Sequence, residues 1–579
     1  MLEVVGVEVN DALLAGWRAR VARARELLHW RVPGGVVARV HAHGASLALA
    51  APCDRLLAAT EVNEWAWCAT LLANDPGHWG ALEDALAAAT LADASDPALV
   101  IRPVLEEGAA LARLEHLSAA EARPALLALL AAARTRSLPH VLGDVTLTLG
   151  AGVGGRDFAL AQLPEPAAVG WDELRDIPTA LVTGSNGKTT TVRLLAACAR
   201  AQGWRCAYNC TDGVFLDSEM LESGDYSGPA GAWRVLRERR AQAAVVEAAR
   251  GGILRRGVAV SQAHVALVTN ISPDHFGEYG IDDLDALADA KLTVAAVVRH
   301  DGLLVLNADD ALLMRKSRGL AARFGRCPTT GWFALDAEAP LLREHRARGG
   351  ATCGVRDGRL CVQCAGAAHD LGAIAAMPLT VGGSASYNIA NLAGAALAAM
   401  ALGVSAEIVA DVFARFGATP ADNPGRMMRF EVNGVRVLLD YAHNPAGLRG
   451  LLEVAEHLRA GAGRLGMLLG HAGNRQDTEI EEVARVAAEF HPALIVVKEN
   501  EGHLRGREPG EIPRLIRAQL MRAGLPEAAL PVRMSELEAA RCALEWARPG
   551  DVLALPVHSP AARAQVLQLL AAMSAPVGT

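Results

Sequence analysis

The sequence predicts an α/β protein of several domains built on parallel β-sheets. From about residue 180 onward, short apolar runs alternate with amphipathic helical runs, which is the pattern of parallel strands joined by helices. A glycine-rich turn, TGSNGKTTT at 183–191, stands between the apolar run that begins at Ala180 and the helical run VRLLAACAR. The chain of 579 residues is too long for one ordinary domain and is long enough for about three or four.

Small apolar side chains dominate the composition. Hydrophobic residues make up 51% of the chain and aromatic residues only 4%, so the cores must consist mainly of Ala, Leu and Val. Such cores suit helices packed closely on parallel sheets. The net charge of −8 argues against a nucleic-acid-binding protein, which usually carries a basic excess. Apolar stretches such as 392–404 are shorter than the roughly 18 residues of a membrane span, so we expect a soluble, cytoplasmic protein without a membrane partner.

Residues 1–165 are expected to form an α+β domain of unknown role. Strand-like runs at 36–40 and 47–50 stand beside an Ala/Leu-rich helical pattern at 125–133. No motif in this region carries recognisable chemistry. Dimerisation, polymer binding and docking of a partner therefore remain open for it, and so does a homo-oligomeric state. The stretch LPEPAAVG at 163–170 is expected to be a linker.

Two further domains are expected, a central one at 175–420 and a C-terminal one at 421–579. In the central domain, ALVTG (180–184), AAVVEA (243–248) and VALVTN (265–270) are expected to be consecutive buried strands. The pattern breaks near TPADNPGR at 419–426 and then restarts, which predicts a separate Rossmann-like domain. Its strands are expected at VRVLLDYAH (435–443), LGMLLG (465–470), ALIVVKE (493–499) and DVLALPV (551–557).

The TGSNGKTTT turn has the strand–turn–helix context that a phosphate-binding loop requires. We expect Lys188 to reach the β- and γ-phosphates of a nucleotide and the Thr189 hydroxyl to hold Mg²⁺. The spacing departs from the general Walker pattern, because Val182 stands where that pattern has its first glycine. The expected nucleotide-binding residues of the turn are Gly184, Ser185, Asn186, Gly187, Lys188, Thr189 and Thr190.

Polar residues also end or follow two other predicted strands. Glu247 ends AAVVEA, and His275 follows VTNISPD. Ligands of open α/β sheets bind beyond the carboxyl ends of the strands, so a carboxylate and an imidazole there are reasonable groups for a metal. Taken singly, Glu247 could pair with Arg250 and His275 could cap the next helix. Together, after a phosphate loop, they favour a magnesium site formed by Thr189, Glu247 and His275.

The ten cysteines do not suggest a disulfide framework in a chain of this length. Cys361 and Cys364 have the CxxC spacing of zinc ligands, with Cys327 and Cys353 nearby. RLCVQC follows a DG turn and alternates like a strand, however, which places the two cysteines in unrelated environments. The strand is the favoured interpretation.

From about residue 178 the chain resembles the Mur ligases, and more closely the Mur-ligase-like part of cyanophycin synthetase. TGSNGKTTT resembles the phosphate loop of that family, and further motifs follow in the same order. These motifs are CTDGVFLD (210–217), GDYSGPAGAWRVL (224–236), EAARGGILRRG (247–257), VTNISPDHFG (268–277), LNADD (306–310), PLTVGGSASYNIAN (378–391), NPGRMMRFE (423–431), DYAHNPAGL (440–448) and KENEGHLRGREPGEI (498–512). At residues 60–67, TEVNEWAW is a weak echo of the first domain of cyanophycin synthetase.

The resemblance implies ATP and Mg²⁺ as cofactors of the reaction. It places Asn388 and Asn391 near the nucleotide base. Arg426 is implied on the phosphate side of ATP and Asp440 on the ribose side. It also places Lys291 where many Mur ligases have a carbamylated lysine, with a plain surface or ion-pairing lysine as the alternative. The catalytic residues that it implies are Lys188, Glu247, His275, Lys291 and Arg426.

The activity that the resemblance implies is ATP-dependent formation of an amide bond through an acyl phosphate. The closest resemblance suggests a peptide or polymer acceptor with aspartate carboxylates and arginine or lysine as the added amino acid. A guanidinium needs a carboxylate partner. Asp477, Glu499 and Glu501 are candidates because they fall near predicted strand ends, with solvated surface charge as the alternative. Residues that we expect to face the acceptor are Thr211, Asp212, Gly213, Ser227, Gly228 and Pro229.

The chain also departs from cyanophycin synthetase. That enzyme carries an ATP-grasp module before its Mur-like part, whereas here barely a linker separates residue 165 from the strand at 180. Extension of a polyaspartate backbone is therefore not expected, and a separate ATP-grasp enzyme is a candidate partner. The loop GHAGNRQD (470–477) matches the glycine-rich pattern of the family only in part.

Three alternatives remain beside the cyanophycin-related activity. The first is a Mur-type ligase acting on another carboxylate, such as a cell-wall precursor or a folate. The second is a non-catalytic protein that binds ATP or polymer and assists a cyanophycin enzyme, which the intact set of expected site residues argues against. The third is a generic P-loop motor, which only GKTT itself supports.

Overall fold

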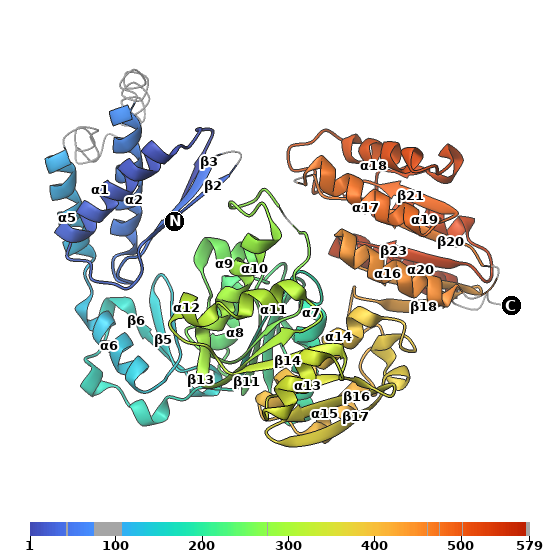
Figure 1. Ribbon diagram of the computed structural model, residues 1–579, viewed down its shortest axis with the longest axis horizontal. Coiled ribbons are helices and arrows are strands. Elements are labelled where there is room, and N and C mark those ends of the chain that lie inside the picture. Colours follow the sequence, from blue (N-terminus) through green and yellow to red (C-terminus); the bar gives the residue numbers. More distant parts are fainter. Residues whose placement is uncertain are drawn as a thin grey trace. The chain divides into compact units, whose positions relative to one another are not determined.

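A computed structural model describes residues 1–41, 44–74, 107–274, 276–459, 461, 463–473, 475–500 and 502–574 of the protein. The chain divides into two compact units (Figure 1). The smaller unit comprises residues 1–149, 157–173 and 277–282. The larger unit comprises residues 150–156, 174–276 and 283–579.

The smaller unit has the α+β organisation that the sequence predicts. Its antiparallel sheet has the order β1 (Leu2–Val5), β3 (Gly44–Leu49) and β2 (Val36–His41). Within its described residues, the α-helices are α1 (Asp11–Leu27), α2 (Leu56–Asn74), α5 (Glu107–Glu121) and α6 (Pro124–Thr135). The indole of Trp17 donates to the Asn63 Oδ1 atom at 2.9 Å, and the Asn63 amide donates to the Leu47 carbonyl, which ties α1, α2 and β3 together. A second small sheet has the order β4 (His140–Leu142), β5 (Thr146–Leu149) and β6 (Arg156–Ala159).

The larger unit contains a sheet of eleven strands in the order β10-β9-β8-β11-β7-β12-β13-β14-β15-β16-β17. Strands β8, β11, β7, β12, β13, β14 and β15 are parallel, and antiparallel hairpins close both edges. The strands are β7 (Thr179–Thr183), β8 (Cys206–Cys210), β9 (Gly213–Leu216), β10 (Glu219–Ser223), β11 (Ala243–Glu247), β12 (Ala263–Val268), β13 (Val298–Asn307), β14 (Thr330–Asp336), β15 (Thr352–Arg356), β16 (Arg359–Cys364) and β17 (Ala367–Ala373).

The three strands expected from the sequence are β7, β11 and β12, and they lie side by side at the centre of this sheet. The expectation that they follow one another directly along the chain is wrong, because β8, β9 and β10 come between β7 and β11. Strands β8 and β10 contain polar residues, and β9 is an apolar run of only four residues. Polar residues such as Asn209 interrupt β8, although Asn209 is fully buried by its bonds to neighbouring backbone.

Helices cover the central sheet, and their small side chains allow close packing. Gly394 in α14 lies against Phe333 and Leu267, where an added Cβ atom would come within 3.2 Å of either side chain. This agrees with the prediction of a core rich in small residues. The helices are α7 (Lys188–Ala201), α8 (Pro229–Arg237), α9 (Arg250–Arg256), α10 (Leu284–Leu292), α11 (Ala311–Ser317), α12 (Leu320–Phe324), α13 (Pro340–Ala347), α14 (Ser386–Ala401) and α15 (Ala406–Phe413).

A second sheet follows in the larger unit, with the order β18-β19-β23-β20-β21-β22. Strand β18 is antiparallel to β19 and the other pairs are parallel, as expected for a Rossmann-like domain. Its strands are β18 (Met428–Val432), β19 (Val435–Asp440), β20 (Leu465–Leu469), β21 (Leu494–Lys498), β22 (Val532–Arg533) and β23 (Val552–Pro556). Helices α16 (Pro445–Leu458), α17 (Asp477–Glu489) and α18 (Glu511–Arg522) contribute to one hydrophobic core, and α19 (Glu536–Trp546) and α20 (Pro560–Ser574) contribute to another.

The CxxC segment is a strand, as the alternating pattern predicts. Cys361 and Cys364 lie in β16, which pairs with β15 and β17. Within the described ranges, no group of three or more His, Cys, Asp or Glu side chains is arranged to hold a metal ion.

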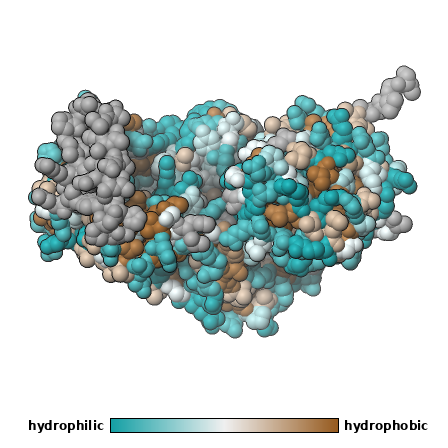
Figure 2. Space-filling view, turned by 90° about the horizontal axis from the view of Figure 1, so that it is seen from above, coloured by the Kyte–Doolittle hydropathy of each residue, from teal (hydrophilic) through white to brown (hydrophobic). Residues whose placement is uncertain are grey.

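Hydrophilic and hydrophobic residues are interspersed over the face of the molecule shown in Figure 2. Among the described helices, none is both long and apolar enough to cross a membrane.

The buried carboxylate of Asp551 joins the amino ends of β20 and β23, which makes it a test of the C-terminal fold. It accepts hydrogen bonds from the Arg464 guanidinium at 2.6 Å and from the backbone N–H groups of Arg464 and Arg548. Asp551→Asn should lower the free energy of unfolding by about 2 kcal/mol, because it replaces a charge-assisted acceptor by a neutral amide. Urea unfolding followed by circular dichroism would measure this. Glu482→Gln, which alters a surface ion pair with Arg485, should leave the midpoint nearly unchanged; equal effects of the two variants would contradict the assignment.

Candidate active site

The turn between β7 and α7 is built on two glycines that no other residue could replace without displacing its neighbours. Gly184 has φ +146° and Gly187 has φ +84°, both in the region that disfavours side chains. A Cβ atom on Gly184 would lie 1.8 Å from the Thr269 Oγ1 atom, and one on Gly187 would lie 2.1 Å from the Asn391 Oδ1 atom. The backbone therefore passes close to β12 and α14 as it enters the helix.

The loop that follows β12 braces this turn. The Ser185 hydroxyl donates to the Ser272 carbonyl at 2.9 Å, and the Asn186 amide donates to the Ser272 hydroxyl at 3.0 Å. The Lys188 ammonium folds back over the turn and donates to the carbonyls of Gly184 and Ser185, each at 3.0 Å. The turn therefore has a defined conformation in which its lysine lies directly over its backbone.

Thr189 and Glu247 meet at the carboxyl ends of β7 and β11. The Thr189 hydroxyl donates to the Glu247 Oε2 atom at 2.8 Å. The Glu247 Oε1 atom is buried and has no hydrogen-bond partner, although the residue is only 1% exposed. Burial raises the pKa of the Glu247 carboxyl, and the nearby Lys188 charge opposes this shift. A buried carboxylate oxygen without a partner is costly unless a further group binds there.

Lys291 lies beneath the same turn rather than on the surface. It is 2% exposed, and its ammonium donates to the Gly184 carbonyl at 2.8 Å. Burial, followed by the Lys188 charge, holds the pKa of Lys291 well below its ordinary value. His275 lies outside the described residues. Its neighbour Asp274 is buried and accepts a hydrogen bond from Arg475 at 3.2 Å.

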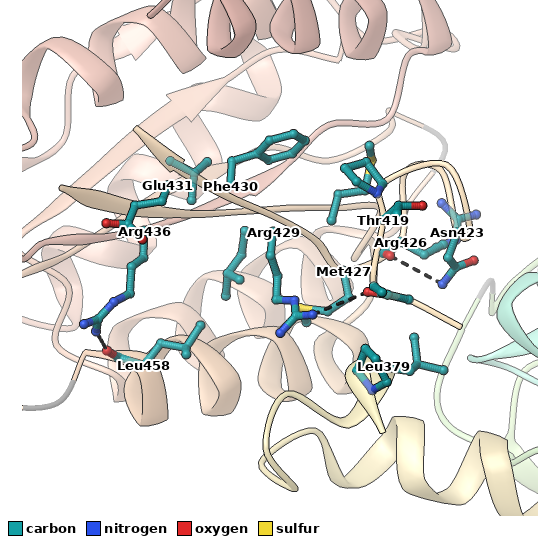
Figure 3. A pocket seen from close by; sticks show the side chains of 17 residues that line it. Leu379, Thr419, Asn423, Arg426, Met427, Arg429, Phe430, Glu431, Arg436 and Leu458 are labelled. Carbon is teal, nitrogen blue, oxygen red and sulfur yellow. Dashed lines mark hydrogen bonds between the residues drawn. The ribbon is translucent and has the colours of Figure 1, made fainter. Parts of the chain in front are cut away.

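The two asparagines of α14 connect the turn to a cavity of about 290 Å³. Asn391 lies against Gly187, and its amide donates to the Asn388 Oδ1 atom at 3.1 Å. The Asn388 amide in turn donates to the carbonyl of Leu379, which lines the cavity. Figure 3 shows Asn423 and Arg426 at one end of this cavity and Arg436 with Leu458 at the other.

Arg426 and Asp440 flank the start of the C-terminal sheet. The Arg426 guanidinium donates to the Thr211 hydroxyl at 3.1 Å and lies 4.0 Å above the ring of Tyr441. The Asp440 carboxylate accepts the N–H group of Met427 at 2.6 Å. Burial raises the pKa of the Asp440 carboxyl, and the Arg426 charge opposes this shift.

The segment expected to face the acceptor is already rich in internal contacts. The Asp212 carboxylate accepts one hydrogen bond from Arg193 and one from Arg563, both at 2.5 Å. The neighbouring arginines outweigh the effect of burial and lower the pKa of Asp212. Ser227 donates to Asp225 at 2.7 Å. Gly213 begins β9, and Gly228 caps α8, which begins at Pro229.

The three acids proposed for guanidinium recognition have different environments. Asp477 pairs with Arg507 at 2.6 Å, and its side chain is 58% exposed. Glu499 is 5% exposed, and its Oε2 atom accepts the N–H group of Gly510 at 2.8 Å. The Glu499 Oε1 atom is buried without a hydrogen-bond partner. Glu501 lies outside the described residues.

Several polar residues of this region were not found from the sequence. Asn423 donates to the Thr190 hydroxyl at 3.2 Å and accepts from Arg193 at the same distance. Arg475 and Arg563 reach Asp274 and Asp212 from distant segments. In the sequence, Arg475 and Arg563 look like solvated surface charges. The hydrophobic pattern therefore gave no indication that they belong to the site.

Comparisons with known proteins agree with this arrangement. Residues 182–339 match the Mur ligase middle domain, and residues 425–555 match the Mur ligase glutamate ligase domain. Cyanophycin synthetase of Nostoc sp. is 35% identical over 381 residues, which cover 66% of this chain and 41% of that protein. The chain thus spans about two fifths of the length of this relative.

Two further relatives extend the match. UDP-N-acetylmuramoyl-L-alanyl-D-glutamate–2,6-diaminopimelate ligase of Alkalilimnicola ehrlichii is 30% identical over 384 residues, covering 64% of this chain and 69% of that enzyme. The structure of E. coli FolC in complex with DHPP and ADP has a similar fold, with a TM-score of 0.50 at 20% identity, over 68% of this chain and 89% of that one. The fold predicted from the sequence is confirmed by these likenesses. The chain belongs to the Mur ligase family, whose members are ATP-dependent acid–amino-acid ligases.

Proposed function

We propose that this protein is an ATP-dependent ligase that joins the amine of an amino acid to a carboxylate of a peptide or polymer. The specific reaction proposed is addition of arginine or lysine to aspartate side chains, as in cyanophycin. The observation that carries the ligase assignment is the buried pair of Thr189 and Glu247 beside the glycine-rich turn, with one Glu247 oxygen left without a partner. The 35% identity to cyanophycin synthetase supports the choice of substrate.

The reaction needs an activated carboxylate, because oxide is a poor leaving group. Transfer of the γ-phosphoryl group of ATP to a carboxylate oxygen gives an acyl phosphate and ADP. The amine then attacks the carbonyl carbon, the C–O bond to phosphate breaks, and the amine loses a proton. Catalysis of such steps consists mainly of positioning and neutralisation of charge.

The residues of the site supply these functions in the proposed complex. Lys188 leaves the carbonyls of its own turn to bind the β- and γ-phosphates, and Arg426 neutralises phosphoryl charge from the other side. Asn388 and Asn391 lie next to the base, with the cavity of Figure 3 as its expected place. Asp440 is assigned to the ribose. Since Arg426 and Asp440 come from the C-terminal part of the larger unit, that part completes the nucleotide site.

The residues at the turn fit Mg²⁺. Mg²⁺ in phosphoryl-transfer sites commonly takes one or two carboxylates, a hydroxyl and phosphate oxygens as ligands. The unpartnered Glu247 Oε1 atom and the Thr189 hydroxyl provide such donors side by side, and His275 is the third expected residue. When bound, the ion would neutralise the negative charge that develops on the phosphoryl group.

Lys291 is proposed to be carbamylated. Burial lowers the pKa of Lys291 and so favours its neutral amine, which is the form that attacks CO₂. The carbamate would place a negative charge beside Lys188 and the metal ligands. The alternative is an unmodified lysine that holds the Gly184 carbonyl, as the structure has it.

Glu499 is the best supported of the three acids for recognition of a guanidinium or ammonium side chain. It is buried at the carboxyl end of β21 and has one oxygen without a partner, whereas Asp477 is exposed and already paired with Arg507. A buried carboxylate binds a cationic group more strongly than an exposed one, since less water competes for it.

A second candidate function is a ligase of the same type acting on a different carboxylate, such as a cell-wall precursor. The 30% identity to a diaminopimelate ligase over 69% of that enzyme supports it. A separate ATP-grasp enzyme is the proposed partner only if the substrate is cyanophycin.

The first experiment measures phosphate release from ATP and Mg²⁺ across acceptors and amino acids. Release should require both an aspartyl acceptor, such as a β-aspartyl peptide or cyanophycin-like polymer, and arginine or lysine. Lys188→Ala should reduce turnover at least about a hundredfold, because it removes the cation that contacts the transferred group. Turnover with muramyl peptides or folates instead would replace the substrate assignment and keep the ligase. Binding of ATP without turnover on any acceptor would favour a non-catalytic role.

Glu247→Gln should make the ligand-free protein more stable while abolishing the reaction. Removal of an uncompensated buried charge is expected to raise the midpoint of thermal unfolding by about 2–4 °C. The same variant should lose stabilisation by Mg²⁺ together with ADP.

Glu238→Gln is the matched control. Glu238 is also buried, but its oxygens accept hydrogen bonds from Arg234 and Arg240, so this variant should lower the midpoint. Equal destabilisation by both variants would contradict the assignment of Glu247 as an open ligand position.

Glu499→Gln should raise the KM for arginine about tenfold or more, since a charged hydrogen bond contributes about 1.5–3 kcal/mol. The KM for ATP should change less than about twofold. Steady-state kinetics with each substrate varied in turn would show this. Asp477→Asn is the control and should leave both constants nearly unchanged; the opposite ranking of the two variants would remove Glu499 from the amino-acid site.

A further inference from the structure

Three ionisable side chains are buried together at the carboxyl end of the C-terminal sheet. Lys498 is the last residue of β21, Glu536 is the first residue of α19, and His558 follows β23 by two residues. Lys498 has no exposed surface and Glu536 is 1% exposed. Fully buried charges are rare unless they are paired, and a buried ion pair is often no more stabilising than apolar residues of the same volume. The cluster therefore calls for an explanation other than stability.

The contacts of Lys498 and of the Ala442 carbonyl favour one tautomer of His558. The Lys498 ammonium donates to Glu536 Oε1, to Asn500 Oδ1 at 3.0 Å and to His558 Nδ1 at 3.1 Å. An ammonium can only donate, so Nδ1 of His558 accepts from Lys498, although Glu536 Oε1 also lies 3.4 Å from this atom. A carbonyl can only accept, so the Nε2 atom that contacts Ala442 carries the ring proton. Burial, followed by the Lys498 charge, lowers the pKa of His558 and so favours the neutral ring.

Glu536 holds the backbone of the same residue. Its two carboxylate oxygens accept the N–H groups of His558 and Ser559 at 2.9 and 2.8 Å. Burial raises the pKa of Glu536, but the nearby Lys498 charge and the side chain of His558 outweigh it and hold this pKa well below its ordinary value. Lys498 thus orients the ring of His558, and Glu536 orients its main chain.

The oriented imidazole contacts the loop that follows β19. Its Nε2–H group donates to the Ala442 carbonyl at 3.0 Å, and its ring packs edge-on against Tyr441 with centroids 5.2 Å apart. The Tyr441 ring also contacts Arg426, whose guanidinium lies 4.0 Å from the ring centre. The loop also carries Asn444, whose amide donates to the Asn186 Oδ1 atom in the glycine-rich turn at 2.9 Å.

We propose that His558, held by Lys498 and Glu536, is a positioning residue that orders loop 440–444 and Arg426 for nucleotide binding. The inference rests on the proposed function, in which Asp440 and Arg426 contact ATP. His558 itself does not touch the nucleotide; it acts through the Ala442 carbonyl and the Tyr441 ring. The buried ion pair then serves to keep one imidazole tautomer in one orientation.

The test compares three variants of the full-length protein by calorimetric titration with ADP in Mg²⁺. His558→Ala should weaken ADP binding about tenfold or more, since the loop loses its hydrogen bond and its ring contact. His558→Gln should stay within about threefold of the wild type, because a carboxamide offers one acceptor and one donor with similar spacing. Asp551→Asn is the control, since it removes a buried charge at the opposite end of β23 and should lower stability without changing ADP affinity.

A double variant, Lys498→Met with Glu536→Gln, removes both charges together and tests the same idea if His558→Ala does not fold. It should weaken ADP binding as His558→Ala does, while thermal unfolding confirms that the fold is retained. The proposal is overturned by wild-type affinity in His558→Ala or, where that variant does not fold, in the double variant. It is also overturned by equal losses in His558→Ala and His558→Gln, or by an equal loss in Asp551→Asn. If the wild type itself does not bind ADP, the proposed function fails together with this inference, whereas unchanged affinity in the variants overturns the inference alone.

Discussion

The close approach of the glycine-rich turn to its neighbours is the constraint on which the site depends. Between β7 and α7 the backbone passes within van der Waals distance of Thr269 and Asn391, and only glycine fits at positions 184 and 187. This contact fixes where α7 begins, and therefore where Lys188 and Thr189 lie relative to Glu247 on the adjacent strand β11. A side chain at Gly184 would push the turn away from β12, and one at Gly187 would push it away from α14. Either change would move Lys188 and Thr189 away from Glu247.

The buried ionisable groups fall into two kinds with opposite consequences. Glu247 and Glu499 each keep an oxygen without a partner, and Lys291 is a buried amine that lies against a backbone carbonyl. In the proposed function these groups are positions for ligands, which would offset the cost of burying them. Lys498 and Glu536, in contrast, compensate one another and hold a third residue in place. The first kind leaves polar atoms open to a further partner, and the second kind is satisfied within the protein.

The similar proteins identify the type of reaction more closely than they identify the substrate. The chain spans 41% of a cyanophycin synthetase and 69% of a diaminopimelate ligase, at 35% and 30% identity. The shared part contains the glycine-rich turn and the strand ends that carry the expected metal residues. The loop 470–477 matches the glycine-rich pattern of the family only in part, whereas the segment 498–512, which contains Glu499, resembles a family motif.

The sequence by itself determined the elements whose signals are local. Period-two and apolar runs identified β7, β11, β12 and the main strands of the C-terminal sheet, and the glycine spacing identified the phosphate-loop turn, because these patterns arise from neighbouring residues in the chain. The same local signals placed Cys361 and Cys364 in a strand.

Only the tertiary structure decided which distant polar groups meet. Asp212 joins Arg193 to Arg563, and Lys498 at the end of β21 orients His558, which follows β23. In the sequence, each of these residues has the pattern of an ordinary surface or core position. Strand β8 was missed for the same reason, since the hydrogen bonds of the buried Asn209 are to other segments. Hydrogen bonds and ion pairs between segments hundreds of residues apart leave no periodic trace in a single sequence, and the fold alone brings their partners together.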